Sequence, residues 1–153
     1  MKVVVTQTLN FPPDVIFAVL TDIPHHVDWV EYPVDLISLS NGPAKLGTTW
    51  KQNAARQGKK LVLVNTCNIY EKNRMFGWKT EKPYLAQVTL FLQPDVDETK
   101  ITWVVESEQT GIVQLAEPLL IKQTNEMIQK SLTRLDLFLQ ARNVVQNQNT
   151  LKA

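Results

Sequence analysis

The chain has 153 residues, of which 44% are hydrophobic, and its 16 basic and 15 acidic side chains leave a formal net charge of +1. This size suits one domain with a substantial core, and the near-neutral charge excludes a strong overall field for attracting nucleic acid or acidic lipid. The single cysteine, Cys67, excludes an intrachain disulfide and a zinc site made of cysteines alone.

The first predicted element is a strand, because residues 2–9 are rich in valine and threonine. The segment NFPPDVIFAVL then changes to a helical period, with Pro13 at the helix start and Asp14 in its first turn. Pro24 precedes a second short helix, predicted over residues 25–29.

Six further strands are predicted, and turn residues separate them. They cover residues 34–40, 47–55, 59–71, 74–81, 85–94 and 99–108. Connections this short favour an antiparallel meander, because parallel neighbours need crossovers of about a dozen residues or more. The sequence therefore predicts a seven-stranded antiparallel sheet.

The last predicted element is an amphipathic helix over about residues 113–143, which would be about 45 Å long. Pro118 suits its start, and the Asn/Gln-rich residues 144–153 are expected to fray, so the predicted domain is residues 1–143. One face of the helix carries an apolar stripe at helical spacing: Ile121, Met127, Ile128, Leu132, Leu135, Phe138 and Leu139.

This order of elements is typical of an α+β fold. The C-terminal helix is the only large amphipathic element that could cover the sheet. A twisted seven-stranded sheet curls, so one helix leaves part of its concave face uncovered. The sequence therefore predicts a cavity between sheet and helix, of about 300–1,000 Å³ if it is a ligand site of ordinary size.

Four motifs and a closing SLTRLDLFL follow one another over residues 3–142: PPDVIFAVLTDIPHHVDW, GTTW, FGW and TKITWVVESEQTG. Together they resemble the START-like, or SRPBCC, superfamily, and most closely its polyketide cyclase/dehydrase and lipid-transport branch. The matching positions are Pro13, Val15, Phe17, Leu20, Asp22, Trp29, Gly47, Thr48, Trp50, Trp78, Thr99, Trp103, Glu106 and Gly111. The resemblance implies the helix-grip fold, in which a curved sheet wraps around the C-terminal helix. It does not identify a ligand, because the superfamily uses one cavity for many chemistries.

The segment HHVDWVEYP, residues 25–33, holds both histidines and carries more charges than the superfamily pattern. Adjacent helical residues point about 100° apart, so His25 and His26 cannot both face one metal ion. His25 with Asp28 supplies only two ligands, and no metal or cofactor is predicted. A His–Asp acid–base pair is one alternative. The interpretation we favour is a solvated helix end at the lip of the cavity.

The tryptophans allow two interpretations. Trp50, Trp78 and Trp103 lie mid-strand, where each would bury about 150–250 Å². They either fill the core or line an aromatic cavity, with Trp29 at its mouth. In the strand over residues 59–71, inward-facing leucines bring Asn65 and Cys67 to the concave face, whereas the opposite register would solvate both. A buried thiol is usually inert, so no nucleophile is predicted.

The candidate cavity residues are Trp29, Trp50, Asn65, Cys67, Phe76, Trp78, Leu90, Trp103, Met127 and Leu135. They favour binding or transport of a small hydrophobic or aromatic molecule, with no catalytic residue predicted. A polyketide cyclase or dehydrase using the same cavity, and a co-chaperone-like interaction module, are the alternatives. No apolar run reaches the ~20 residues that span a bilayer, and the N-terminus turns polar too early for a signal peptide. A cytoplasmic protein with no nucleic-acid partner is expected.

Overall fold

The computed structural model describes residues 1–31, 35–40, 42–56, 58–108 and 112–152. Strand β1 (Lys2–Leu9) is followed by helix α1 (Pro13–Leu20) and the 3₁₀ helix η1 (Ile23–Asp28). Six strands come next: β2 (Leu36–Leu39), β3 (Thr49–Arg56), β4 (Lys59–Glu71), β5 (Met75–Lys82), β6 (Ala86–Asp95) and β7 (Glu98–Ser107). A short helix α2 (Ile112–Leu115) leads into the long helix α3 (Glu117–Lys152). The matched position Gly111 lies outside the described residues.

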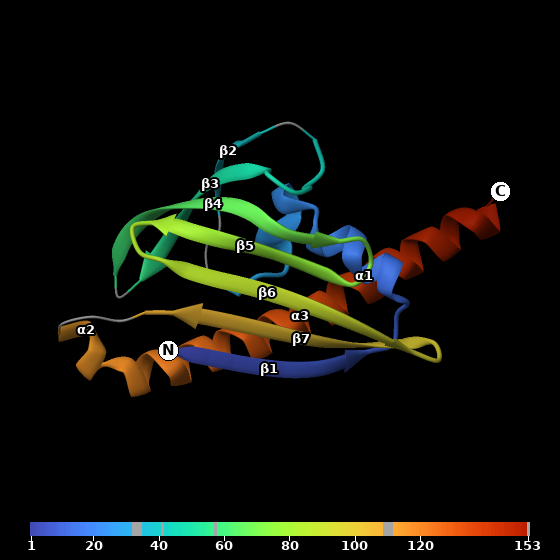
Figure 1. Cartoon of the computed structure of the whole chain (residues 1–153). Helices are drawn as coiled ribbons and strands as arrows, with labels where there is room; N and C mark the ends of the chain where they lie inside the picture. The colour runs from blue at the N-terminus through green and yellow to red at the C-terminus, as the bar shows by residue number, and fades with distance from the viewer. Residues whose placement is uncertain (32–34, 41, 57, 109–111, 153) are drawn as a thin grey trace.

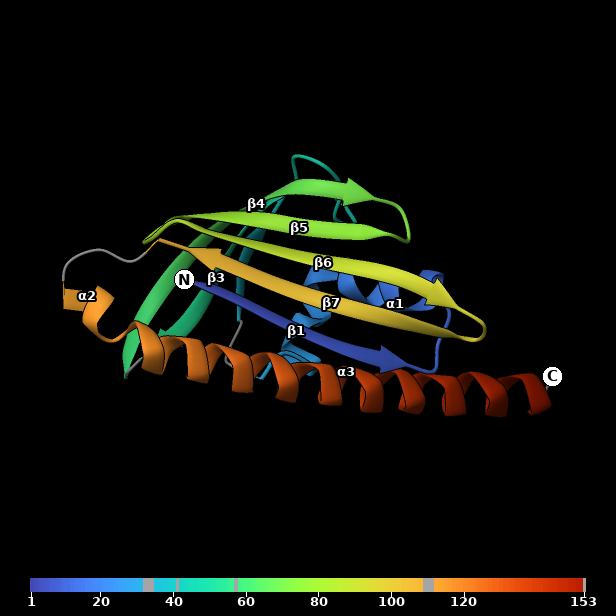
Figure 2. The ribbon, with the colours of Figure 1, turned by 60° about the horizontal axis from the view of Figure 1, so that its bottom comes forward.

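The seven strands form one antiparallel sheet in the order β1-β7-β6-β5-β4-β3-β2. Consecutive strands from β2 to β7 are neighbours, whereas β1 returns from the start of the chain to pair with β7. The sheet curves over α3, which runs along its concave side, while α1 and η1 lie behind the sheet in the view of Figure 1 (Figures 1 and 2). The predicted α+β helix-grip fold is confirmed.

Strand β4 shows how the sequence pattern sets the sheet face. Leu63, Asn65 and Cys67 are buried, whereas Val62 and Asn68 beside them are exposed. This alternation confirms the predicted register. The pairing of β4 with β5 shifts between Cys67 and Ile69, an irregularity that increases the local bend of a strand. Because of this alternation, the polar residue Asn65 lies on the concave face together with Leu63 and Cys67, and it is 0% exposed.

Helix α3 buries the predicted stripe only over its middle. Ile128, Leu132 and Leu135 are fully buried, but Ile121 is 36% exposed, so its predicted place in the covered stripe is wrong. At that end of α3 the neighbouring side of the helix faces the sheet, and Leu120 is buried instead. Pro118 lies in the first turn, as predicted.

The predicted end of α3 at about residue 143 is too early. The helix continues to Lys152 and has 36 residues, which corresponds to about 54 Å. The segment from Asn143 onward is rich in Asn and Gln, which are not strong helix formers, yet it continues the helix without a breaker such as proline or glycine. Among the described helices, none is long and apolar enough to cross a membrane.

Candidate functional site

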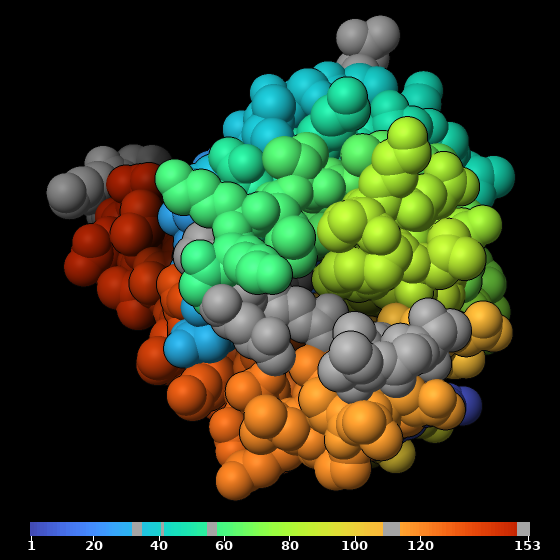
Figure 3. All heavy atoms as spheres, turned by 90° about the vertical axis from the view of Figure 1, so that its left-hand side faces the viewer, coloured from blue at the N-terminus to red at the C-terminus, as the bar shows by residue number. Residues whose placement is uncertain are grey.

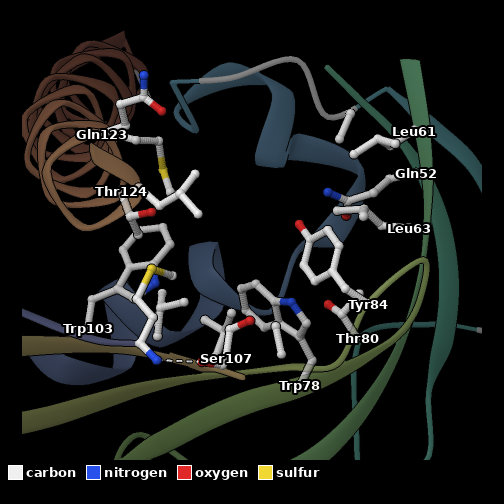
Figure 4. Close-up of a pocket in the computed structure, with 17 residues that line it drawn as sticks. Gln52, Leu61, Leu63, Trp78, Thr80, Tyr84, Trp103, Ser107, Gln123 and Thr124 are labelled. Atoms are coloured by element: carbon white, nitrogen blue, oxygen red, sulfur yellow. Dashed lines mark hydrogen bonds between the residues drawn. The ribbon is translucent and has the colours of Figure 1, made fainter. Parts of the chain in front are cut away.

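A cavity of about 240 Å³ lies between the concave sheet face and the N-terminal half of α3 (Figure 4). Its volume is somewhat below the predicted range. Strands β3 to β7 form the floor and sides, and α3 closes the opposite side. The apolar lining consists of Met1, Ala54, Leu61, Leu63, Trp78, Ala86, Val88, Trp103, Val105, Leu120 and Met127.

The cavity reaches the surface at one end of the molecule. Gln123, which is exposed, and Leu120, which is buried, both line it from α3. Figure 3 shows the end where the β3–β4 hairpin, the turn between β5 and β6 and the first turns of α3 gather. The elements around the opening are thus contributed by three segments far apart in the sequence.

Three of the ten predicted cavity residues line this space: Trp78, Trp103 and Met127. The others are core residues packed beside or beneath it: Trp29, Trp50, Asn65, Cys67, Phe76, Leu90 and Leu135. The predicted place of Trp29 at the cavity mouth is wrong, because η1 turns its ring inward and leaves it 1% exposed. Both interpretations of the tryptophans therefore hold in part: two line the cavity, and two fill the core.

Several lining residues were not among the predicted ones, and Gln52 and Thr80 are the most informative of them. A signal for Gln52 exists in the sequence, since it is two residues from Trp50 on one strand and so shares its face. Tyr84 lies in the turn between β5 and β6, and alternation gives no guide to the direction of a side chain in a turn.

The aromatic rings beneath the cavity form a continuous arc. The rings of Trp50 and Trp78 lie 5.7 Å apart, and Trp78 lies 6.1 Å from His26. His26 in turn packs edge-on to Trp29 at 5.3 Å, and Trp29 packs edge-on to Trp103 at 5.9 Å. Such edge-to-face pairs contribute about 0.5–1.5 kcal/mol each beyond the area they bury. Two members of the arc, Trp78 and Trp103, line the cavity, so this part of the wall packs directly against buried rings of the core.

The two histidines have opposite environments. His25 is exposed, and its Nδ1 lies 2.7 Å from a carboxylate oxygen of Asp22, not of Asp28. His26 is buried, and its Nε2 lies 2.7 Å from the Leu20 carbonyl oxygen, which can only accept. Nε2 therefore carries the hydrogen. The solvated helix end predicted for this segment is correct for His25 and wrong for His26, because adjacent helical side chains point to different sides.

We expect acid to destabilise the fold through His26. Burial lowers the pKa of His26 below its usual 6.5, and the bond to Leu20 and the charge of Asp22 oppose this only in part. Between the folded and unfolded pKa values, the unfolded chain binds a proton that the folded chain does not. Stability that is present above pH 6.5 is therefore lost as the pH falls through the folded-state pKa. Urea unfolding followed by circular dichroism at several pH values measures this loss.

Replacing His26 with phenylalanine removes the titrating group and should flatten the pH dependence in that window. His25→Phe is the matched control, because the side chain is exposed and its loss leaves the buried ring in place. A His26→Phe protein whose stability falls with pH as steeply as that of the unchanged protein would contradict the assignment.

A network of hydrogen-bonded, buried side chains connects strands β3, β4 and β5 next to the cavity. Trp50 Nε1 donates to Gln52 Oε1 at 2.9 Å, and Asn65 Nδ2 donates to the same oxygen at 3.2 Å. Thr80 Oγ1 donates to Asn65 Oδ1 at 2.7 Å. All four residues are buried. Gln52 and Thr80 line the cavity, whereas Trp50 and Asn65 hold them from behind.

Ionisable side chains are scarce in the wall. The described lining residues include no Asp, Glu, His, Cys, Lys or Arg side chain. Cys67 is buried behind the wall, where burial raises the pKa of its thiol despite a hydrogen bond to the Ile69 carbonyl. Within the described ranges, no three His, Cys, Asp or Glu side chains are grouped so that they could hold a metal ion.

The fold is shared with solved structures of low sequence identity. TTHA0849 from Thermus thermophilus is 16% identical, with a TM-score of 0.75 over 93% of this chain and 99% of that one. NE0264 from Nitrosomonas europaea is 15% identical, with a TM-score of 0.72 over 94% of this chain and 97% of that one. CV1439 from Chromobacterium violaceum is 16% identical, with a TM-score of 0.68 over 90% of this chain and 96% of that one. At these identities the likeness concerns the fold alone.

A comparison with curated proteins finds no match. The family model described as polyketide cyclase/dehydrase and lipid transport matches residues 1–137, which is most of the chain. That match covers the sheet and the part of α3 that lines the cavity. It also confirms the resemblance carried by the sequence motifs. The chain belongs to the polyketide cyclase/dehydrase and lipid-transport family.

Proposed function

We propose that this protein binds a small hydrophobic or aromatic molecule in the cavity between the sheet and α3. The observation that carries the proposal is the cavity itself, a space of about 240 Å³ with a mainly apolar wall and two tryptophans, Trp78 and Trp103, in it. An apolar cavity of about 150 Å³ is enough to bind benzene. The space here therefore suits a ligand of about two fused rings, or a chain of similar volume.

The residues of the cavity wall fit a binding function better than a catalytic one. A cyclase or dehydrase needs a group that moves a proton within hydrogen-bond reach of its substrate. The described lining side chains include no carboxylate, histidine, cysteine or lysine, which are the groups that most often move protons in enzymes. Shape and hydrogen bonding dominate this wall, as is usual for a binding site.

An apolar fluorophore, an anilinonaphthalene sulfonate, should bind the native protein saturably. Its binding should quench or shift tryptophan emission, because Trp78 and Trp103 border the cavity, and should raise the melting temperature by mass action. Replacing Met127 with tryptophan should fill the space and weaken binding by about tenfold or more, about 1.4 kcal/mol. Fluorescence titration measures both effects.

Leu137→Trp is the matched control, because Leu137 is on the same helix but 59% exposed and away from the cavity. It should leave probe affinity unchanged. Equal affinities for the unchanged protein and Met127→Trp would show that the probe binds elsewhere, and no saturable binding at all would refute the proposed function.

A further inference from the structure

One polar side chain in the cavity wall is almost wholly buried and still has hydrogen-bonding capacity. Gln52 is 8% exposed and lines the cavity from β3. Its Oε1 accepts two hydrogen bonds, from Trp50 and from Asn65. Its Nε2 donates to none of the described residues. Within the described part of the chain, the wholly buried side-chain nitrogens without a partner are the indole nitrogens of Trp29 and Trp103, so the Gln52 Nε2 remains accessible from the cavity. A bound ligand would cut this donor off from water, and the donor then needs a partner on the ligand.

The indole of Trp50 fixes the orientation of the Gln52 amide. An indole N–H only donates, so the Gln52 atom 2.9 Å from it must be the oxygen. The Asn65 atom that faces this oxygen must then be its nitrogen, which leaves Oδ1 to accept from Thr80. Turning the Gln52 amide over would place an N–H against the indole N–H. Figure 4 shows the resulting arrangement, with the Gln52 nitrogen directed toward the cavity.

Within this hydrogen-bonded network, the Gln52 amide is the donor that remains available to a ligand. The hydroxyl hydrogen of Thr80 is committed to Asn65 Oδ1, so toward the cavity Thr80 offers only an oxygen lone pair. Trp50 Nε1–H and one N–H of the Asn65 amide are directed at Gln52 Oε1, and neither residue lines the cavity. The network therefore presents one N–H₂ group to the cavity, in a fixed direction and in a wall that is mainly apolar.

We propose that Gln52 is a specificity-determining residue that selects apolar ligands carrying a hydrogen-bond acceptor of the carbonyl type. This inference rests on the proposed binding function and adds the chemistry of the ligand. A ligand without an acceptor leaves the Gln52 donor buried and unpaired, and sites built around a buried polar group discriminate against such ligands. An acceptor at the right position satisfies the donor without any rearrangement of the network.

The test compares two probes of nearly the same shape, 2-acetylnaphthalene and 2-isopropenylnaphthalene. The first carries a carbonyl oxygen where the second carries a CH₂ group. Their affinities are measured by fluorescence for the unchanged protein and for Gln52→Met, which keeps the side-chain length and removes the amide. In this cycle, effects common to both probes cancel. The expected result is that Gln52→Met weakens the ketone about two- to tenfold more than the alkene, the range for one net hydrogen bond.

Gln87→Met is the matched control variant. Gln87 lies in β6 and exchanges hydrogen bonds with Asn68 on the exposed outer face of the sheet. Removing its amide should leave the ratio of the two affinities as it is in the unchanged protein. A shift in that ratio in the control as large as in Gln52→Met would overturn the assignment to Gln52.

A second measurement needs no variant, in case Gln52→Met does not fold. The carbonyl stretch of ¹³C-labelled 2-acetylnaphthalene bound to the unchanged protein should lie at lower wavenumber than in hexane, because a hydrogen bond weakens the C=O bond. A bound ketone with the frequency it has in hexane would overturn the role of Gln52 while leaving the proposed function intact. If neither probe binds saturably, the proposed function fails and the inference fails with it.

Discussion

Replacing Trp29 with alanine is expected to lower the free energy of unfolding by about 3–5 kcal/mol, the usual cost of removing a buried aromatic side chain. Trp29 is 1% exposed and joins two parts of the core, since it packs against His26 from η1 and against Trp103 from β7. Its loss would leave a cavity under the wall of the binding site. Urea unfolding followed by far-ultraviolet circular dichroism measures the change.

Trp29→Phe separates packing from hydrogen bonding. Within the described part of the chain, the indole N–H of Trp29 has no hydrogen-bond partner, so phenylalanine removes an unpaired polar group along with some volume. The two effects oppose each other, and Trp29→Phe should cost well under half as much as Trp29→Ala. A phenylalanine variant as unstable as the alanine variant would show that the indole N–H does contribute.

The burial of Trp29 also shows what the sequence pattern does not predict. Strand alternation predicted which residues share the concave face, and the register of β4 confirms it at Asn65 and Cys67. Alternation does not give the position of a residue along the sheet relative to α3. Trp50 and Trp78 pack against each other, yet only Trp78 reaches the cavity. That difference depends on where the helix crosses, which is a property of the tertiary structure.

Short irregular elements were the least predictable part. The sequence places His25 and His26 next to each other, and only the packing of η1 against the sheet decides which of them is buried. The hydrogen-bonded network next to the cavity was not predicted, for a related reason. Gln52, Asn65 and Thr80 belong to three strands, and their hydrogen bonds depend on cross-strand register. In the sequence they are 13 and 15 residues apart, with no motif to connect them.

Replacing Asn65 with leucine should cost about 2–5 kcal/mol of stability, although the two side chains differ little in size. Asn65 is 0% exposed and bonds both Gln52 and Thr80. Its loss removes the acceptor of the buried Thr80 hydroxyl and one of the two donors that hold Gln52. Each buried polar group left unpaired costs about 1–3 kcal/mol. The same variant should also reduce the preference for the ketone probe, because Gln52 loses part of its support.

Asn68→Leu is the matched control for this last effect. Asn68 is in the same strand and also takes part in two side-chain hydrogen bonds, both with Gln87, but on the exposed face. Water replaces those partners when the amide is removed, so the change should stay within about 0.5 kcal/mol, as is usual for surface sites. The difference between the two asparagines measures burial at constant chemistry. If both variants cost the same, the network around Asn65 does not stabilise the fold as its geometry indicates, and the fixed orientation of Gln52 loses its structural basis.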